Sequence, residues 1–263
     1  MNLTEEQLTA TLAGRRIGFP VHYFPEVDST NIRAWRLAMA DAPEGTAVVA
    51  DSQSRGKGRL NRAWQSPPGV NIYTSLVLRP RIEPAAAPQL TLVAGVAVAE
   101  LLTGYHPPGV TIKWPNDVLI GGKKVCGILT EMKSTAAGID FIILGIGINV
   151  NTGRGDFEPA LRETATSLKI VTGTGFDRRE VISDLFSRLE KWYSVFLARG
   201  FPGVRETWLH YADILGRPIR VVFKEDSSCG VVTGIDDDGT LVMQDARGGY
   251  RRVVAGDVYL LKG

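Results

Sequence analysis

A short basic segment, residues 54–64 (SRGKGRLNRAW), carries the residue types best suited to binding an anion. Its two glycines, Gly56 and Gly58, remove side chains that would keep a ligand away from the backbone, and they permit turns that expose several N–H groups. Charge and a face for stacking come from Lys57, Arg59, Arg62 and Trp64. An arginine can hold a carboxylate or a phosphate through two parallel hydrogen bonds. The spacing is not that of a Walker loop, and the segment alone fits an anion-binding loop and a solvated hairpin tip equally well.

A second polar group follows a short apolar run, in residues 113–132 (KWPNDVLIGGKKVCGILTEM). Pro115 keeps Trp114 extended and removes a backbone donor, so the chain must turn after the run. The turn and its flanks hold Lys113, Asn116, Asp117 and Lys124. An Asn-Asp pair can simply cap a surface turn, but two lysines and a tryptophan beside it favour a binding site.

A third group is the sequence GIGINVN at residues 145–151, which follows the apolar run FIIL. A Gly-x-Gly pair in such a strand allows another group to approach the backbone closely, and Asn149 can both donate and accept hydrogen bonds. The pattern does not complete GxGxxG and no helix clearly follows, so a Rossmann dinucleotide site is not expected.

Other common kinds of site are not indicated. The three histidines lie far apart, with no cysteine or histidine partners at metal-ligand spacing, so a protein-held zinc is not expected. The sequence also has no GxSxG nucleophile elbow and no cysteine–histidine nucleophile pattern.

The elements that must position these groups alternate irregularly between strand and helix. Apolar runs typical of strands lie at residues 21–24, 45–51, 71–80, 110–114, 124–133 and 138–151. Helical spacing marks residues 28–40, 87–104 and 177–211, with a stop at Gly200, and a capping box at Thr4 opens a short helix that ends near Gly14. This order argues against a doubly wound parallel sheet and predicts an α+β fold with a mixed sheet.

The last part of the chain has a different character. From about residue 215 onward, five short β-rich runs alternate with turns such as DDDGT and ARGG, a spacing typical of a small barrel. The predicted organisation is therefore a domain of residues 1–213 followed by a small β-barrel domain of residues 214–263.

Composition and charge are those of an ordinary globular protein. The 263 residues include 30 Lys and Arg against 28 Asp and Glu, a net charge of +2, which disfavours binding to nucleic acid by bulk electrostatics. The N-terminus lacks the regions of a signal peptide, and no uninterrupted apolar run reaches the roughly 18 residues of a membrane-spanning helix. Cys126 and Cys229 lie in apolar contexts and are expected to be buried, reduced thiols. A cytoplasmic protein without membrane association is expected.

Five motifs together carry a family resemblance. DSTN, SQSRGKGRLNRAW, KWPNDVLIGGKKVCGIL, GIGINVN and ATSL occur here in the order and approximate spacing seen in biotin protein ligases, also called biotin–[acetyl-CoA-carboxylase] ligases. The resemblance covers nearly the whole chain, and it implies a mixed-sheet catalytic domain flanked by helices and a C-terminal SH3-like barrel. About 28 residues precede DSTN, too few for the helix-turn-helix domain of regulatory members, so the resemblance is to ligase-only members, and no DNA binding is expected.

The resemblance also implies the reaction, its substrates and its partner. The biotin carboxylate attacks the α-phosphate of ATP, with Mg²⁺, to give biotinyl-5′-AMP and pyrophosphate. A lysine of the biotin carboxyl carrier protein of acetyl-CoA carboxylase, or of a related carboxylase, then attacks this acyl adenylate and releases AMP. A homodimer is compatible with the sequence, which does not fix the oligomeric state.

Site residues follow from the matched motifs. The resemblance implies contacts to biotin from Ser29, Thr30, Asn31, Gln53, Lys57, Gly58, Arg59 and Lys124. Arg59 is the expected anchor of the phosphoryl group and Lys124 the expected ligand of the biotin carboxyl, which gives both a catalytic role. The nucleotide is assigned to Arg62, Trp64, Asn116, Asp117 and Asn149, with Asp117 the candidate for Mg²⁺. Two positions depart from the family pattern, because Lys57 stands for an arginine and Asn61 for a glycine, and no barrel residue is assigned.

Three alternatives remain open from the residues themselves. A lipoate–protein ligase has a related catalytic fold, and lipoate-dependent activity would identify it. A nucleic-acid-binding module could also combine a basic loop with a small β-barrel. A catalytically silent biotin-binding or scaffold protein is the third, and the presence of both Arg59 and Lys124 argues against it.

Overall fold

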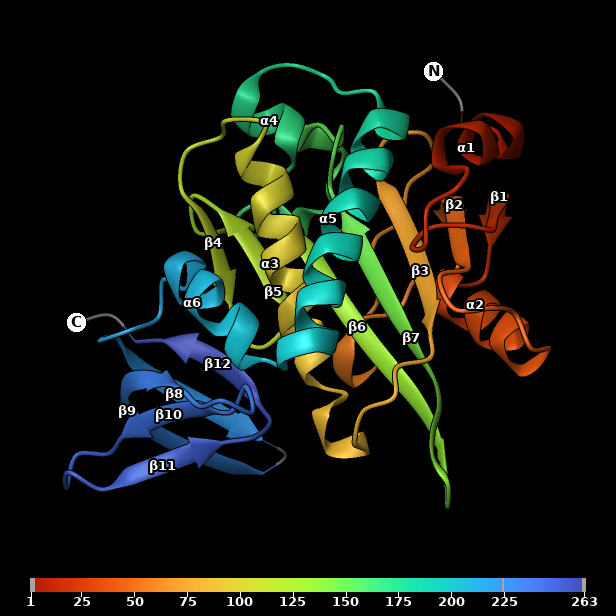
Figure 1. The fold of residues 1–263 in the computed structure, drawn as a ribbon. Coiled ribbons are helices and arrows are strands. Elements are labelled where there is room, and N and C mark those ends of the chain that lie inside the picture. Colours follow the sequence, from red (N-terminus) through yellow and green to blue (C-terminus); the bar gives the residue numbers. More distant parts are fainter. Residues whose placement is uncertain (1–2, 224, 262–263) are drawn as a thin grey trace.

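The computed structural model describes residues 3–223 and 225–261 and arranges them as two β-sheets with six α-helices (Figure 1). The α-helices are α1 (Glu5–Leu12), α2 (Thr30–Met39), α3 (Gln89–Thr103), α4 (Leu168–Thr172), α5 (Arg178–Arg199) and α6 (Pro202–Tyr211). Short 3-10 helices are η1 (Arg59–Asn61), η2 (Pro84–Ala86), η3 (Arg154–Asp156) and η4 (Pro159–Leu161). The first helix begins as predicted, since Thr4 Oγ1 accepts a hydrogen bond of 3.2 Å from the Gln7 N–H.

The larger sheet is mixed, as predicted. Its strands are β1 (Val21–Val27), β2 (Ala47–Gln53), β3 (Ile72–Leu78), β4 (Val110–Lys113), β5 (Asp117–Ile120), β6 (Lys123–Thr135) and β7 (Gly138–Ile148). They lie in the order β1-β2-β3-β7-β6-β5-β4. Only β1 and β2 pair in parallel, and every other pair is antiparallel. Strands β6 and β7, which carry two of the predicted motifs, are therefore direct neighbours.

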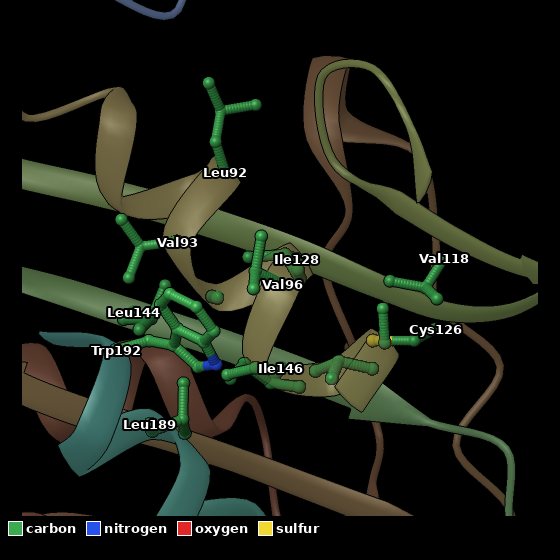
Figure 2. Packing of buried hydrophobic residues seen from close by; sticks show 14 of the residues in the cluster. Leu92, Val93, Val96, Val118, Cys126, Ile128, Leu144, Ile146, Leu189 and Trp192 are labelled. Atoms are coloured by element: carbon green, nitrogen blue, oxygen red, sulfur yellow. The ribbon is translucent and has the colours of Figure 1, made fainter. Parts of the chain in front are cut away.

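Helices cover both faces of this sheet, and β7 shows why. Alternate residues of a strand point to opposite faces. The even-numbered apolar residues 142–148 of β7 belong to the main core against α3 and α5, where Val93, Leu144 and Trp192 lie together (Figure 2). Phe141 and Ile143 face the other way, in a second cluster with Ala34 and Ala38 of α2. On that second face β7 continues with Gly145 and Gly147, so the strand presents no side chains of its own beside the start of α2.

Helix α3 is almost entirely apolar because it lies between the sheet and α5. The stretch Pro84–Thr103 is long and apolar enough to cross a membrane by those two criteria, although the sequence had indicated no apolar run of that length. In the structure 67% of its most apolar window is buried inside the protein, and α3 packs on α5, α6, β4 and β6. Such burial is that of a core helix.

The second sheet is antiparallel and confirms the five predicted C-terminal strands. They are β8 (Pro218–Phe223), β9 (Asp226–Ile235), β10 (Leu241–Gln244), β11 (Tyr250–Val253) and β12 (Asp257–Leu260), in the order β11-β10-β9-β8-β12. The contacts of this sheet with the rest of the protein include two hydrogen bonds to main-chain oxygens, from Trp114 Nε1, just after β4, to Gly239 (3.2 Å) and from Arg205 Nε, on α6, to Ile235 (2.7 Å). Both sheets contribute to one hydrophobic core, and the boundary between residues 213 and 214 stays a prediction.

Two local features differ from the sequence expectations, and one agrees with them. Strand β5 was not predicted, because its four residues begin with a polar aspartate and lie between two turns. The helical pattern of residues 177–211 is divided into α5 and α6 at the predicted stop, Gly200, where φ is 65°. Cys126 is buried as expected, but Cys229 is exposed, since it lies on the outward face of β9; neither thiol forms a disulfide.

Candidate active site

A cavity of about 520 Å³ lies on the second face of the large sheet, beside the start of α2 and beneath the basic segment. Strand β12 of the second sheet reaches its rim through Asp257, Val258 and Tyr259. The cavity is lined by every residue that the family resemblance assigns to the site, namely Ser29, Thr30, Asn31, Gln53, Lys57, Gly58, Arg59, Arg62, Trp64, Asn116, Asp117, Lys124 and Asn149. The fold therefore brings the separate motifs to one place.

Three glycines form the floor of this cavity. Gly127 on β6 pairs directly with Gly147 on β7, and Gly145 lies two residues earlier on the same face. A Cβ atom on Gly145 would lie 2.0 Å from Asn31 Oδ1, and one on Gly147 would lie 2.6 Å from the Trp64 indole. The close approach predicted at GIGIN is thus made by two side chains of the site itself.

The start of α2 supplies the polar groups assigned to biotin. Ser29 is the N-cap residue, but its side chain makes no capping hydrogen bond, and the side chains of residues 29–31 are turned into the protein with at most 4% exposure. Gln53 Oε1, at the end of β2, accepts hydrogen bonds from the Thr30 N–H (2.8 Å) and the Thr30 hydroxyl (3.2 Å). The first turn of α2 therefore has no hydrogen bond from the side chain of its N-cap residue, and Thr30 is held instead by Gln53 of β2.

Two further residues, which the sequence did not indicate, hold Asn31. Ser75 Oγ on β3 lies 2.6 Å from Asn31 Oδ1, and Glu131 Oε2 on β6 accepts a 2.7 Å hydrogen bond from Asn31 Nδ2. Serine and glutamate on predicted strands are too common to have been singled out. Together they fix the orientation of the Asn31 amide at the cavity wall.

The basic segment closes on itself over the cavity. Gly58 N–H donates to the Arg62 carbonyl (2.7 Å), Trp64 N–H donates to the Gly56 carbonyl (2.9 Å), and the tip of the segment carries η1. At the tip Asn61 has φ of 57°, a left-handed conformation that asparagine tolerates better than most residues. The segment is a structured hairpin whose cations are gathered above the floor.

A carboxylate of the second sheet holds the arginines of this hairpin. Asp257, the first residue of β12, forms an ion pair with Arg62 and lies 3.7 Å from Arg59. Arg59 also donates to the Gly256 carbonyl (3.3 Å) and to Asn116 Oδ1 (3.1 Å). A single aspartate at a strand start gives no signal in a sequence, so this contact between the two sheets was not predicted.

Lys124 lies at the centre of the site, near the start of β6. Its Nζ is 2.6 Å from Asp117 Oδ1 and 5.3 Å from the centre of the Trp64 ring. Its main chain is held between residues 164 and 166 by two hydrogen bonds of 2.8 and 2.9 Å. Lys123, by contrast, forms an ion pair at the surface with Glu163, whose side chain is 91% exposed. The structure therefore distinguishes the two adjacent lysines.

The thiol of Cys126, two residues further along, plays no part in the site. Burial raises its pKa above the ordinary value, an effect larger than the opposing one of the nearby Lys124. The thiol therefore stays protonated and unreactive.

The side assigned to the nucleotide is bordered by Trp64 and Asn149. Trp64 Nε1 is buried and has no hydrogen-bond partner within residues 3–223 and 225–261, so a ligand in the cavity could accept from it. Asn149 is 5% exposed; its Nδ2 donates to the Thr166 carbonyl (3.1 Å) and its Oδ1 accepts from Asn71 Nδ2 (3.4 Å). Thr166 belongs to the ATSL motif, which thereby reaches the site.

The part of the chain that the structure describes holds no group of three or more His, Cys, Asp or Glu residues arranged to bind a metal. Among the cavity carboxylates, Asp117 is engaged by Lys124 and Asp257 by two arginines. This donor set does not form a protein cage for a cation. It fits a magnesium ion that keeps water and substrate phosphates as its main ligands.

Replacing Asp257 with alanine is expected to loosen the hairpin in the ligand-free protein. Trypsin should then cut after Arg59 or Arg62 about five-fold faster, because a partly buried ion pair contributes on the order of 1 kcal/mol. Limited proteolysis with mass spectrometry would measure the rate. The control is Asp237→Ala, which removes a surface aspartate that lies in the turn between β9 and β10, 3.8 Å from Arg205. Equal cleavage of the two variants would show that Asp257 does not hold the hairpin.

Two family sequence models match the chain. The Biotin/lipoate A/B protein ligase family matches residues 23–149, which contain the large sheet and most of the cavity. The Biotin protein ligase C terminal domain matches residues 214–261, which contain the second sheet.

Individual relatives agree with these matches. The chain is 39% identical over 258 residues to the "Bifunctional ligase/repressor BirA" of Bacillus spizizenii, covering 98% of this chain and 79% of that protein. It is 37% identical over 226 residues to the "Biotin--[acetyl-CoA-carboxylase] ligase" of Paracoccus denitrificans, covering 84% of this chain and 92% of the other. The structure resembles "Biotin protein ligase from Aquifex aeolicus in complex with biotin and ATP", with a TM-score of 0.79 and 31% identity over 92% of this chain and 99% of that one.

Proposed function

This chain belongs to the biotin protein ligase family, and we propose that it joins biotin to a protein lysine in two steps within the cavity described above. In the first step a biotin carboxylate oxygen attacks the α-phosphorus of ATP, which forms biotinyl-5′-AMP and releases pyrophosphate. In the second step an acceptor lysine amine attacks the acyl carbon and AMP leaves. The observation that carries the proposal is the convergence of all thirteen sequence-indicated residues on one cavity of about 520 Å³.

The charges of the cavity suit the first step, which brings two anions together. Donors aimed at developing negative charge in a site shielded from water are among the most effective catalytic devices. Lys124 would neutralise the biotin carboxylate, and Arg59 would hold the phosphoryl group. Both cations have carboxylate partners, Asp117 and Asp257, which hold them at the cavity.

Biotin and nucleotide would occupy different parts of the cavity. The buried hydroxyl and amide groups at the start of α2, with Gln53, are proposed to hydrogen-bond the ureido ring. Lys57 and Gly58 would lie along the bound acid. The nucleotide would lie toward Trp64, whose free indole N–H and flat face are available to it, with Arg62, Asn116, Asp117 and Asn149 around it.

The hairpin has a second task, which is to exclude water from the intermediate. An acyl adenylate hydrolyses readily, so a closed site protects it until the acceptor arrives. The pairing of the hairpin with itself and with Asp257 provides such a cover. For the second step the hairpin must let the acceptor amine reach the acyl carbon. The acceptor is proposed to be the biotin carboxyl carrier protein of acetyl-CoA carboxylase or of a related carboxylase.

Magnesium is proposed to enter with ATP. Asp117 would supply one oxygen ligand, and the remaining ligands would be water and phosphate oxygens. The ion would offset phosphate charge during the first step. Asp117 would thus serve both the ion and Lys124, whose Nζ lies 2.6 Å from Asp117 Oδ1 and which would remain the cation for the biotin carboxylate.

The test is the formation of biotinyl-5′-AMP by the purified chain. ATP radiolabelled at the α-phosphate should yield the acyl adenylate when biotin is present, and a carrier domain should then become labelled with biotin. Lipoate in place of biotin is the discriminating control. Adenylate formation with lipoate alone would establish the lipoate ligase alternative. The expectation that the chain binds no DNA stays a prediction, which a gel shift on duplex DNA would check.

A further inference from the structure

A buried ion pair lies just outside the cavity, and the reaction as proposed does not use it. Arg178, the first residue of α5, has a side chain only 3% exposed, and its Nη1 lies 2.6 Å from Asp51 Oδ1 on β2. A largely buried ion pair adds little net stability over an apolar pair of similar size, since its charges lose much of their hydration; here the Asp51 side chain keeps 19% exposure. Stability alone therefore does not account for a charged pair at this position.

The pair is connected to the cavity through Asn71. The same Arg178 Nη1 donates to the Asn71 carbonyl (3.3 Å), immediately before β3. The side chain of Asn71 is itself buried, at 1% exposure, and it lines the cavity. Its Oδ1 accepts from the Val150 N–H (2.9 Å) and the Thr152 hydroxyl (2.9 Å), and its Nδ2 donates to Asn149 Oδ1 (3.4 Å).

The Asn71 side chain thus bonds three residues of the segment 149–152, which forms a wall on the nucleotide side. Asn149 and Thr152 both line the cavity. The orientation of the Asn149 amide is set by Asn71 on one side and by the Thr166 carbonyl on the other. These two partners therefore determine in which direction the Asn149 amide can still donate or accept a hydrogen bond within the cavity.

We infer that Asn71 is a positioning residue for nucleotide binding and that the buried Asp51–Arg178 pair holds it in register. The inference rests on the proposed function, which assigns ATP to the wall formed by residues 149–152. The biotin side has supports of its own, because Thr30 is bound by Gln53 and Asn31 by Ser75 and Glu131. Loss of the Asn71 side chain should therefore weaken the binding of ATP and leave the binding of biotin nearly unchanged.

The first test replaces Asn71 with alanine in the full chain. Binding of ATP and of biotin is measured separately by isothermal titration calorimetry, with thermal unfolding as the check on folding. The Kd for ATP is expected to rise about ten-fold or more, while the Kd for biotin stays within about two-fold, because the lost hydrogen bonds all support the nucleotide wall. Equal changes in both constants, or no change in a folded variant, would overturn the inference.

Asn151 provides a matched control. It holds the same segment through two hydrogen bonds of 2.9 Å to the main chain of Phe176, but its side chain does not line the cavity. Asn151→Ala should lower thermal stability to a similar extent and leave the Kd for ATP within about three-fold. If Asn151→Ala weakens ATP binding as much as Asn71→Ala, the effect is general loosening and the inference is wrong.

Two conservative variants complete the test. Asn71→Asp keeps the acceptor for Val150 and Thr152 but loses the donor to Asn149. The Kd for ATP should therefore lie between those of the unmodified chain and of Asn71→Ala. This variant carries the test if the alanine variant does not fold. Arg178→Lys keeps the charge but not the guanidinium fork, and the ATP constant should rise about three-fold or more. A folded Arg178→Lys with unchanged ATP binding would show that the ion pair does not hold Asn71.

The outcome for the unmodified chain separates this inference from the proposed function. A chain that binds biotin but not ATP would refute both. A chain that binds both substrates and forms biotinyl-5′-AMP, with Asn71→Ala unchanged in its affinity for ATP, would refute only the inference.

Discussion

Replacing Lys124 with alanine is expected to slow formation of biotinyl-5′-AMP by about 10²–10³-fold while leaving the protein folded. The loss corresponds to about 3–4 kcal/mol of transition-state stabilisation. Lys124 Nζ lies at the centre of the cavity, 2.6 Å from Asp117 and over the Trp64 ring. Lys124 Nζ lies directly at the floor on which the carboxylate and the α-phosphate are proposed to meet, since a Cβ atom on Gly127 would be 3.3 Å from it. The fold should persist because the side chain is one-third exposed and packs in no core cluster.

The measurement is a single-turnover assay with both substrates saturating, which separates the chemical step from weakened binding. Lys123→Ala is the matched control, since it removes the adjacent lysine, whose ion pair with Glu163 lies at the surface. Its rate should stay within about two-fold of the unmodified chain. If Lys124→Ala retains near-full activity and Lys123→Ala does not, the assignment of the two lysines is reversed.

Three polar groups of the site could be predicted from unusual local residue combinations, whereas the biotin contacts at residues 29–31 and 53 and the roles of the individual residues followed from the family resemblance. A basic glycine-rich segment, a proline-fixed Asn-Asp turn and a Gly-x-Gly strand are each recognisable within about a dozen residues. Their convergence follows from the sheet order, in which β6 and β7 are neighbours and β2 delivers the basic segment to the same face. Alternating strands and helices were likewise sufficient to predict a mixed sheet and a separate set of C-terminal strands.

The parts that could not be predicted depend on contacts between distant segments. Asp257 meets the hairpin only because the second sheet packs against the first, and an aspartate at a strand start has no distinctive local pattern. Asn71 resembles any polar residue before a strand until its partners on the segment 149–152 are known. Strand β5 has four residues and a polar start, so the same letters describe a turn equally well. The glycines predicted a close approach, but the groups that approach them come from α2 and the hairpin.

Substitutions at Gly145 and Gly147 are expected to distinguish the biotin site from the ATP site most clearly. Gly145→Ala should weaken biotin binding about ten-fold or more and leave ATP binding nearly unchanged, whereas Gly147→Ala should do the reverse. The new methyl group at residue 145 would lie 2.0 Å from Asn31 Oδ1, and at residue 147 it would lie 2.6 Å from the Trp64 indole. Each displaced side chain is assigned to a different substrate. Overpacking of this kind costs about 1–3 kcal/mol, which is enough to produce the expected shifts in Kd.

Both variants belong to one strand and one face, so each serves as the control for the other. Both place an alanine on β7, so any effect of alanine on the strand itself is the same in the two variants. A difference between their affinities for biotin and ATP therefore reports only which side chain is displaced. Gly234→Ala, on β9 and with open space around the added methyl group, should change neither affinity. Titration calorimetry with biotin and with ATP would measure all three variants. The close contacts at the two glycines differ in which side chain must move, Asn31 for residue 145 and Trp64 for residue 147. If both floor variants weaken the binding of the same substrate, then Asn31 and Trp64 do not mark opposite ends of the cavity.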